Sequence, residues 1–506
     1  MSRKMIVPIL IALLPSLASC QHLLWRLEGD SGVPEPPPPP PPVSGYFYVD
    51  PAGGSDDADG DSVSDPWKTI AYAMAHADNG SVVYLLDGDY GDLTIDGPVS
   101  SRTSWNDTLT VTPYADAAAF DRLYVTNMPD AYVRFQGLTI HVPDGSGGPY
   151  AFMVDDSSHI MIDDCTIDGD FTEDVAANLT QHGLDINGDT STTSYIIVTD
   201  CNIVEARYPV YVRGAVRDGV SITGCTIHVA SASFVSVNTD GGHGTITLEG
   251  NVLFGRTEIS NDHGSGFSCR SNKLTIRNNV ITGFGGSGGI RFYTDVPTIY
   301  SDMTIENNLI FGVPVSTYLY CRQMGSDVVI RNNTCVPTWK SEPASDSLYR
   351  YLGGSSFALA TGGPYSDIVM RGNVLLGINT FVGTFQSVVD EDYNLYWTLK
   401  DDSSFYGSGW GAHSTVAIDP NGYNAPFDAS YFETPGTFFT GMADFDDTFF
   451  AIDANPGYEV SYLDAFTPAS GSLAVGGGDA DNAPADDLTG IARDSSPDLG
   501  ALEYVP

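Results

Sequence analysis

The amino-acid sequence predicts an all-β protein folded as a single-stranded parallel β-helix, a solenoid of stacked coils. Three observations lead to this fold: a short pattern recurs along the middle of the chain, its strands alternate apolar and polar residues, and turn-forming residues are abundant. The 54 glycines and the 17% of charged residues are typical of short strands joined by tight turns. With 42% hydrophobic residues, the 506-residue chain has enough apolar material for a large core.

The recurring pattern is a run of alternating apolar residues, then Asn or Cys, then a further apolar residue. It is clear from Ile160 to Ile167 and returns every 24 to 40 residues. The Asn or Cys position is held in turn by Cys165, Cys201, Cys225, Asn251, Asn279, Asn308, Asn333 and Asn373. A unit of this length cannot bury its own apolar face, so successive units must stack.

The cysteines of this pattern are expected to form a buried ladder of small apolar side chains. Cys269, Cys321 and Cys335 also fall on positions that alternate inward. The spacing of adjacent coils, about 4.8 Å, would also permit a Cys201–Cys225 disulfide.

The N-terminus has the layout of an export signal. Arg3 and Lys4 precede an apolar run to Leu14 that is too short to span a bilayer. The sequence Leu17-Ala18-Ser19-Cys20 resembles a bacterial lipobox, which implies a lipid on Cys20 and a location at the outer membrane or cell surface. The proline tract 34–42 should form a stiff spacer. We therefore divide the chain into a signal peptide (1–19), a Pro-rich linker (20–43), a β-helix with an N-terminal cap (44–389), and late coils with a closing segment (390–506).

The charge balance excludes some partners. Asp and Glu total 64 against 22 Lys and Arg, which gives a net charge of -42. Nucleic acid is therefore not expected to bind, and the membrane is reached only through the lipid on Cys20. We expect a monomer.

Three parts of the chain resemble the right-handed parallel β-helix superfamily of pectate-lyase-like proteins. They are the opening from Tyr46 to Ile70 with an Ala-rich helix to Ala77, the coils, and the ending from Asp487 to Tyr504. The resemblance covers residues 44–506. It implies a right-handed solenoid whose N-terminal end is plugged by the short helix.

One strand of each coil carries the candidate site, because its alternate residues point outward. The first outward column contains Met153, Asp185, Tyr211, Ser236, Ser268, Arg291 and Tyr320. The second contains Asp155, Asn187, Arg213, Asn238, Arg270, Tyr293 and Arg322. Arg213, Arg270 and Arg322 are two coils apart, roughly 9–10 Å, which suits alternate charged sugars of an anionic polysaccharide. The same columns also fit ordinary exposed strand residues without a function.

The function that we favour is a polysaccharide lyase acting on a uronate-containing glycan by β-elimination. Arg270 would neutralise the substrate carboxylate, and His263 or Tyr211 would move the protons. The residues expected to bind substrate are Arg213, Asn238, Arg291, Tyr293, Tyr320, Arg322 and His182. If Ca²⁺ is a cofactor, its candidate ligands are Asp185, Asp240 and Asp262.

The chain also resembles, loosely, the alginate-lyase and chondroitinase-B type of β-helix. That type carries a Lys-Ser on one coil and an Arg on the next, whereas here Arg270-Ser271 and Tyr293 stand at those positions.

Two alternatives remain open from the sequence. One is a non-catalytic surface protein that binds glycans. The other is a glycoside hydrolase of the polygalacturonase kind, because Asn238 to Gly244 resembles two short motifs of that family. Its two carboxylates would be Asp185 with Asp240 or Asp262.

Overall fold

The computed structural model describes most of the solenoid and the C-terminal segment. The described residues are 45–97, 102–115, 118–143, 148–169, 180–188, 193–214, 216, 218–230, 232–239, 244–254, 265–282, 288–292, 300–311, 317–322, 325–336, 356–360, 368–378, 380–382, 389–398, 412–418, 463 and 466–504. The export signal, Cys20 and the proline tract lie outside them.

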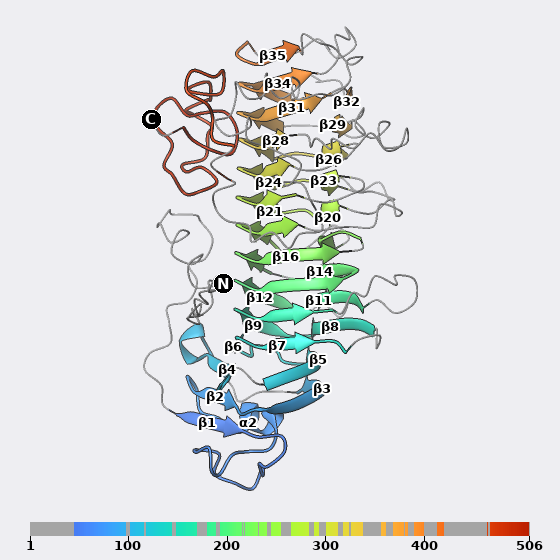
Figure 1. Ribbon diagram of the computed structural model, residues 1–506, viewed down its shortest axis with the longest axis vertical. Coiled ribbons are helices and arrows are strands. Elements are labelled where there is room, and N and C mark those ends of the chain that lie inside the picture. Colours follow the sequence, from blue (N-terminus) through green and yellow to red (C-terminus); the bar gives the residue numbers. More distant parts are fainter. Residues whose placement is uncertain are drawn as a thin grey trace, which may run out of the picture.

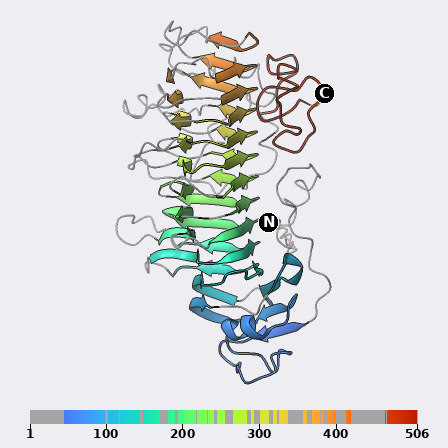
Figure 2. The ribbon, with the colours of Figure 1, turned by 180° about the vertical axis from the view of Figure 1, so that it is seen from behind.

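The chain winds into a stack of coils with three strand faces, which Figures 1 and 2 show from opposite sides. All strand pairs within the stack are parallel, and each strand pairs with the equivalent strand of the coils above and below it. This is the predicted parallel β-helix.

The first face is a 13-stranded sheet. Its strands are β1 (Tyr46–Val49), β2 (Val82–Leu85), β4 (Leu109–Pro113), β6 (Val133–Gln136), β9 (Ser158–Asp163), β12 (Ser194–Thr199), β15 (Val220–Thr223), β18 (Ile246–Glu249), β21 (Leu274–Arg277), β24 (Met303–Glu306), β27 (Val328–Arg331), β30 (Ile368–Arg371) and β33 (Val389–Asp392).

The second face follows the Cys or Asn position of each coil. It contains β7 (Thr139–His141), β10 (Thr166–Asp168), β13 (Asn202–Ala206), β16 (Thr226–Ala230), β19 (Val252–Phe254), β22 (Val280–Ile281), β25 (Leu309–Phe311), β28 (Thr334–Val336), β31 (Val374–Ile378), β34 (Leu395–Thr398) and β35 (Thr415–Ile418).

The third face carries the two outward columns. It contains β3 (Gly88–Asp96), β5 (Ala118–Thr126), β8 (Gly148–Asp155), β11 (Thr180–Gly188), β14 (Tyr208–Gly214), β17 (Val235–Asn238), β20 (Ser265–Arg270), β23 (Gly288–Phe292), β26 (Thr317–Arg322), β29 (Ser356–Ala360) and β32 (Thr380–Val382).

The corner between the first and second faces explains the repeating pattern. The residue before each Cys or Asn is in the left-handed backbone region, with φ between 52° and 69°. Those residues are Asp164, Asp200, Gly224, Gly250, Asn278, Asn307, Asn332, Gly372 and Tyr393. Asp, Asn and Gly adopt this conformation more readily than other residues, which is why they recur there. The left-handed residue turns the chain by one corner and places the next side chain inside.

Buried asparagines link the later coils through their side-chain amides. Asn308 is typical: its Oδ1 accepts from the backbone N–H and the Nδ2 of Asn279 (3.1 and 2.9 Å), and its own Nδ2 donates to Asn333 Oδ1 (2.9 Å). The ladder begins where Cys225 N–H donates to Asn251 Oδ1, 3.0 Å away. It continues to Asn394, which the sequence pattern did not identify, and ends at Ser414 Oγ.

Cysteines hold the same corner in the earlier coils, as predicted. Cys165, Cys201 and Cys225 are 1% exposed, and Cys269 and Cys335 are fully buried. All five are free thiols, so the Cys201–Cys225 disulfide that the spacing permitted is not formed. Burial, with the neighbouring Cys165 and Cys225, raises the pKa of the Cys201 thiol well above its usual value. The side chain of Cys321 lies outside the described residues.

The N-terminal end is occupied by the helix α2 (Ile70–His76), beside β1 and β3 (Figure 1). Thr69 caps it by accepting from the backbone N–H of Tyr72 at 3.1 Å. Ile70, Ala73 and Met74 are buried in the main core. A single 3-10 turn, Trp105–Asp107, precedes β4. Among the described residues, we find no helix with the length and apolar character needed to cross a membrane.

The C-terminal segment, residues 466–504, packs along the flank of the later coils instead of closing the end of the stack (Figures 1 and 2). Its backbone bonds the coils directly: Gly500 N–H donates to Gly372 O (2.7 Å), and Ala501 N–H donates to Thr334 Oγ1 (2.8 Å). Leu488 and Leu499 share a second apolar cluster with β25 and β31.

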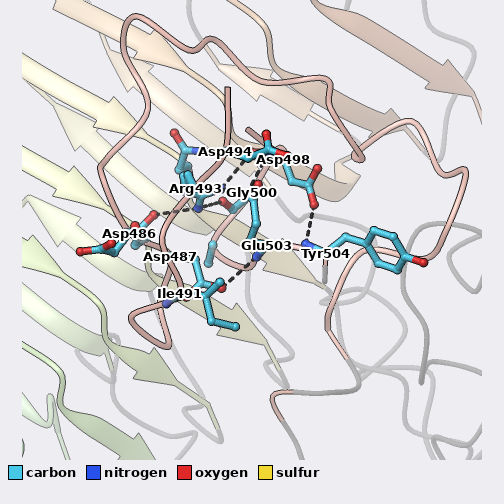
Figure 3. Close-up of polar contacts among 12 residues, drawn as sticks. Asp486, Asp487, Ile491, Arg493, Asp494, Asp498, Gly500, Glu503 and Tyr504 are labelled. Atoms are coloured by element: carbon cyan, nitrogen blue, oxygen red, sulfur yellow. Dashed lines mark hydrogen bonds and ion pairs between the residues drawn. The ribbon is translucent and has the colours of Figure 1, made fainter. Parts of the chain in front are cut away.

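A buried ion pair organises this segment internally (Figure 3). Arg493 donates to Glu503 Oε2 at 2.9 Å, and both side chains are less than 10% exposed. Arg493 also reaches the solenoid, where its Nη2 donates to Asn307 Oδ1 at 3.1 Å. Burial lowers the pKa of Arg493 from its usual value, and the carboxylates around it oppose that shift.

Candidate functional site

The strand register on the third face aligns both predicted columns. In the first, Met153, Asp185, Tyr211, Ser236, Ser268, Arg291 and Tyr320 are successive partners. In the second, Asp155, Asn187, Arg213, Asn238 and Arg270 are successive partners. The alternate residues predicted to point inward on β8, β11, β14, β17, β20 and β23 are all fully buried. The period-2 prediction of orientation is therefore confirmed for these strands.

The columns are less exposed than an open ladder would be. Asp185 is only 1% exposed, although it points out of the core, because two side chains enclose its carboxylate. Arg213 Nε lies 3.0 Å from Asp185 Oδ1, and Arg213 Nη2 lies 3.2 Å from Oδ2. His182 Nδ1 lies 2.7 Å from the same Oδ2. Arg213 is therefore held in an ion pair with the neighbouring coil, with 30% of its side chain exposed.

His182, Asp185, Tyr211, Arg213 and Asn238 form one contiguous group, which we call the His182 cluster. The rings of His182 and Tyr211 stack with centroids 4.3 Å apart. Asn238 Nδ2 donates to the Tyr211 hydroxyl at 3.4 Å. His182 lies within β11, not in the turn before it, and three strands on successive coils thus supply the cluster.

The contact with Asp185 fixes the orientation of the His182 ring. An ionised carboxylate only accepts hydrogen bonds, so the contact with Asp185 places the proton of a neutral His182 on Nδ1. The lone pair is then on Nε2, on the other side of the ring. The phenol of Tyr211 lies against the same ring and provides a second group that can donate or accept a proton.

Further polar contacts extend the site toward the N-terminal coils, and they include Tyr124, which the sequence interpretation missed. Tyr124 donates to Asp155 Oδ2 at 2.9 Å, and Asn187 Nδ2 donates to Asp155 Oδ1 at 3.0 Å. Burial raises the pKa of Asp155, although the hydrogen bond from Tyr124 opposes the shift.

An aromatic row accompanies these polar contacts. Tyr150, His182 and Tyr208 are register partners on β8, β11 and β14. Burial raises the pKa of Tyr150 above its ordinary value. Tyr124 pairs with Met153, so extending the first column by one coil would have identified it, whereas Tyr150 lies on β8 itself, the strand of Met153 and Asp155.

The structure describes the side chains of only some of the other predicted site residues. Arg270 and Arg291 lie on β20 and β23 at their predicted column positions and are partly exposed. Tyr320 and Arg322 lie on β26, but their side chains are not among those described. His263, Tyr293, Asp240 and Asp262 lie outside the described residues, as does Cys20.

The carboxylate of Asp185, a candidate calcium ligand, already contacts two protein side chains. Both oxygens contact Arg213, and Oδ2 also contacts His182. In the part of the chain that the structure describes, no group of three or more His, Cys, Asp or Glu side chains is arranged to hold a metal ion. Two of the three candidate ligands, Asp240 and Asp262, lie outside the described residues, so the calcium site stays a prediction.

Comparisons with known proteins agree with this architecture. Residues 208–338 match the family model described as a right handed beta helix region. A search of curated proteins found no match. Among solved structures, the chain is similar to the pectate lyase Pel9A, with 14% identity, a TM-score of 0.50, and coverage of 92% of this chain and 97% of that one.

Two other structures are more distant. The PL6 family alginate lyase AlyGC has 12% identity and a TM-score of 0.33, over 71% of this chain and 54% of that chain. This chain thus spans about half the length of that enzyme. The GH136 lacto-N-biosidase from Eubacterium ramulus has 12% identity and a TM-score of 0.42, over 74% and 67%.

The family-model match, the similarity to Pel9A and the parallel register of every coil agree on one architecture. The chain is a right-handed parallel β-helix.

Proposed function

We propose that this β-helix protein cleaves an anionic, uronate-containing polysaccharide by β-elimination at the His182 cluster. The observation that carries the proposal is the contact of His182 Nδ1 with the buried carboxylate of Asp185, beside the stacked phenol of Tyr211. The similar structure Pel9A is a pectate lyase, which supports the same class of reaction.

The reaction needs three groups, and the cluster offers candidates for each. His182 Nε2 takes the proton next to the substrate carboxylate, whose electron pair forms the new carbon–carbon double bond. The bond to the glycosidic oxygen then breaks, and Tyr211 donates its phenolic proton to that oxygen. Arg213 and Arg270, on the same column, stabilise the negative charge that develops on the carboxylate.

The test is a panel of acidic polysaccharides with the parent protein, His182→Ala, Tyr211→Phe and Arg270→Ala. We expect the parent to generate unsaturated uronates, read by their ultraviolet absorbance. Loss of His182 or of the Tyr211 hydroxyl should slow the reaction by about 10²–10⁴-fold. Tyr114→Phe, at an exposed position after β4, is the matched control and should retain full activity.

Other outcomes discriminate the alternatives. New reducing ends without unsaturated products would indicate a hydrolase, and binding without turnover would indicate a glycan-binding protein. Full activity in Arg270→Ala would remove that residue from the site, and full activity in both His182→Ala and Tyr211→Phe would remove the cluster.

We also propose that the protein is exported and anchored through a lipid on Cys20. The lipobox-like sequence from Leu17 to Cys20 supports this proposal, and the proline tract that follows suits a spacer between membrane and solenoid. Cys20→Ala should release the protein from the membrane fraction of an expressing bacterium.

A further inference from the structure

A second aromatic group lies away from the third face, at the corner where successive coils enter the first face. The rings of Tyr132 and His159 stack with centroids 4.2 Å apart, and those of His159 and Tyr195 with centroids 4.7 Å apart. Trp105 meets Tyr132 edge-on at 5.4 Å. We call Tyr132, His159 and Tyr195 the corner stack.

All three residues of the corner stack have a left-handed backbone, with φ of 46°, 58° and 53°. This conformation is unfavourable for bulky side chains and costs on the order of 1 kcal/mol or more per residue. Such strain is kept where the surrounding structure or a function requires it. Here the conformation lines up three rings on three successive coils.

The stack stops at Tyr195 because the next coil has a glycine at the equivalent position. Ile196 pairs with Val220, which places Gly219 beside Tyr195, and Gly219 also has a positive φ of 48°. A Cβ atom added to Gly219 would lie 3.6 Å from Tyr195 Cδ1. A side chain there would therefore cover the second face of the Tyr195 ring. Because residue 219 is a glycine, that face is left uncovered by this position. Tyr195 is 45% exposed, in contrast to the enclosed middle ring of His159.

Two carboxylates of described residues lie beside the stack. Asp130 lies 3.3 Å from His159 Nδ1 and is 75% exposed, and Asp218 next to Gly219 is exposed. Burial lowers the pKa of His159, which favours the uncharged ring, and Asp130 opposes this shift. The negative π face of a tyrosine and two carboxylates disfavour an anionic ligand. A neutral pyranose suits the position, because its flat array of C–H bonds packs on an aromatic face and its hydroxyls can donate to carboxylates.

We propose that the exposed ring of Tyr195, above Gly219, binds a neutral pyranose of a glycan, which adds one further ring to the corner stack. This site is proposed to bind a neutral glycan, whereas the His182 cluster is proposed to act on an anionic one. The proposal therefore does not depend on the function proposed for that cluster. It would hold neutral polysaccharide on the first-face side while the third face remains available.

Affinity electrophoresis of the full chain in gels containing neutral polysaccharides tests this proposal. The probes are hydroxyethyl cellulose, xylan, galactomannan and galactan, with polygalacturonate as the acidic comparison. Retention of the parent by at least one neutral probe is expected. Tyr195→Ala should weaken that retention roughly tenfold, whereas Tyr195→Phe keeps the ring and should retain binding.

Two further variants make the result specific. Gly219→Asn places a side chain over the ring, at a backbone conformation that Asn tolerates, and should abolish retention as Tyr195→Ala does. Tyr114→Ala removes a similarly exposed tyrosine (52%) outside the stack and should change nothing. Retention by none of the neutral probes, or equal retention by Tyr195→Ala and the parent, would overturn the proposal and leave the stack a structural element. Activity on acidic substrates should be the same in all four variants, so failure here is distinct from failure of the lyase.

Discussion

At the scale of the residue, the buried amides of the asparagine ladder join each later coil to its neighbours. Each amide accepts from one neighbour and donates to the other, so no member can be replaced without leaving partners on both sides unpaired. Asn308, for example, also donates to Ile276 O at 2.9 Å and is fully buried. An unpaired buried polar group costs about 1–3 kcal/mol.

Asn308→Ala should therefore lower the free energy of unfolding by on the order of 3 kcal/mol. It removes the acceptor for Asn279 and the donor for Asn333 and Ile276 together. Urea unfolding followed by circular dichroism measures the loss. Asn202→Ala, at a partly exposed position on β13, is the control and should cost far less. Equal losses in the two variants would show that the ladder adds nothing.

At the residue scale, the sequence predicted which side chains point outward but not how deeply Asp185 is buried. Alternation placed Asp185, Tyr211 and Arg213 on the outward columns, because the period of a strand is fixed by its geometry. It did not predict that Asp185 would be buried. That burial comes from His182, three residues earlier, and from Arg213 on the next coil, and alternation describes neither contact.

At the scale of the element, the C-terminal segment depends on ion pairs with the first face. Arg371, the last residue of β30, forms ion pairs with Asp479 of the segment and with Asp390 of the next strand. Burial alone would raise the pKa of Asp479, but hydrogen bonds from Asn482, Arg371 and the backbone outweigh it and lower the pKa. The ionised form of Asp479 is therefore favoured in the folded protein.

The lowered pKa fixes the sign of a pH effect. The stabilisation from Asp479 is fully present above the ordinary Asp pKa of about 4 and is lost as the pH falls through the lower folded value. Asp479→Asn should lower stability at pH 7 by about 1–3 kcal/mol, and the difference from the parent should shrink below about pH 4. Thermal melts of both proteins across this range test it. Asp481→Asn, at an exposed position two residues on, should match the parent throughout.

The elements differ in how far the sequence predicts them. The coils were predictable because the same corner recurs, and α2 was recognisable from its Ala-rich sequence after Thr69. The course of the C-terminal segment was not, since its contacts are single events. The backbone N–H of Gly500 donates to Gly372 O, and Arg493 donates to Asn307, nearly 190 residues earlier. No repeating sequence pattern predicts either contact.

At the scale of the whole molecule, the net charge of -42 is the dominant electrostatic property. Many arginines are committed to local pairs, such as Arg277 with Glu249 and Arg331 with Glu306 on the first face. The excess carboxylates repel one another in the compact state, and salt screens that repulsion over about 10 Å at 0.1 M.

Raising NaCl from low to moderate concentration should therefore raise the melting temperature of the protein, with most of the gain complete at a few hundred millimolar. Differential scanning calorimetry measures it, with sucrose of equal osmolality as the uncharged control. A fall in melting temperature with salt would mean that the exposed ion pairs outweigh the repulsion.

The asparagine corner has a consequence for how this architecture changes in length. An Asn-bearing coil meets another Asn-bearing coil on either side through the same pair of amide contacts, so a whole coil inserted or deleted within that half leaves every amide paired. The junction between Cys225 and Asn251 lacks this freedom, since the two sides of it are chemically different. Duplication or deletion of a whole coil should accordingly be tolerated among the C-terminal, Asn-bearing coils. A change of coil number at the boundary between the Cys225 and Asn251 corners should not.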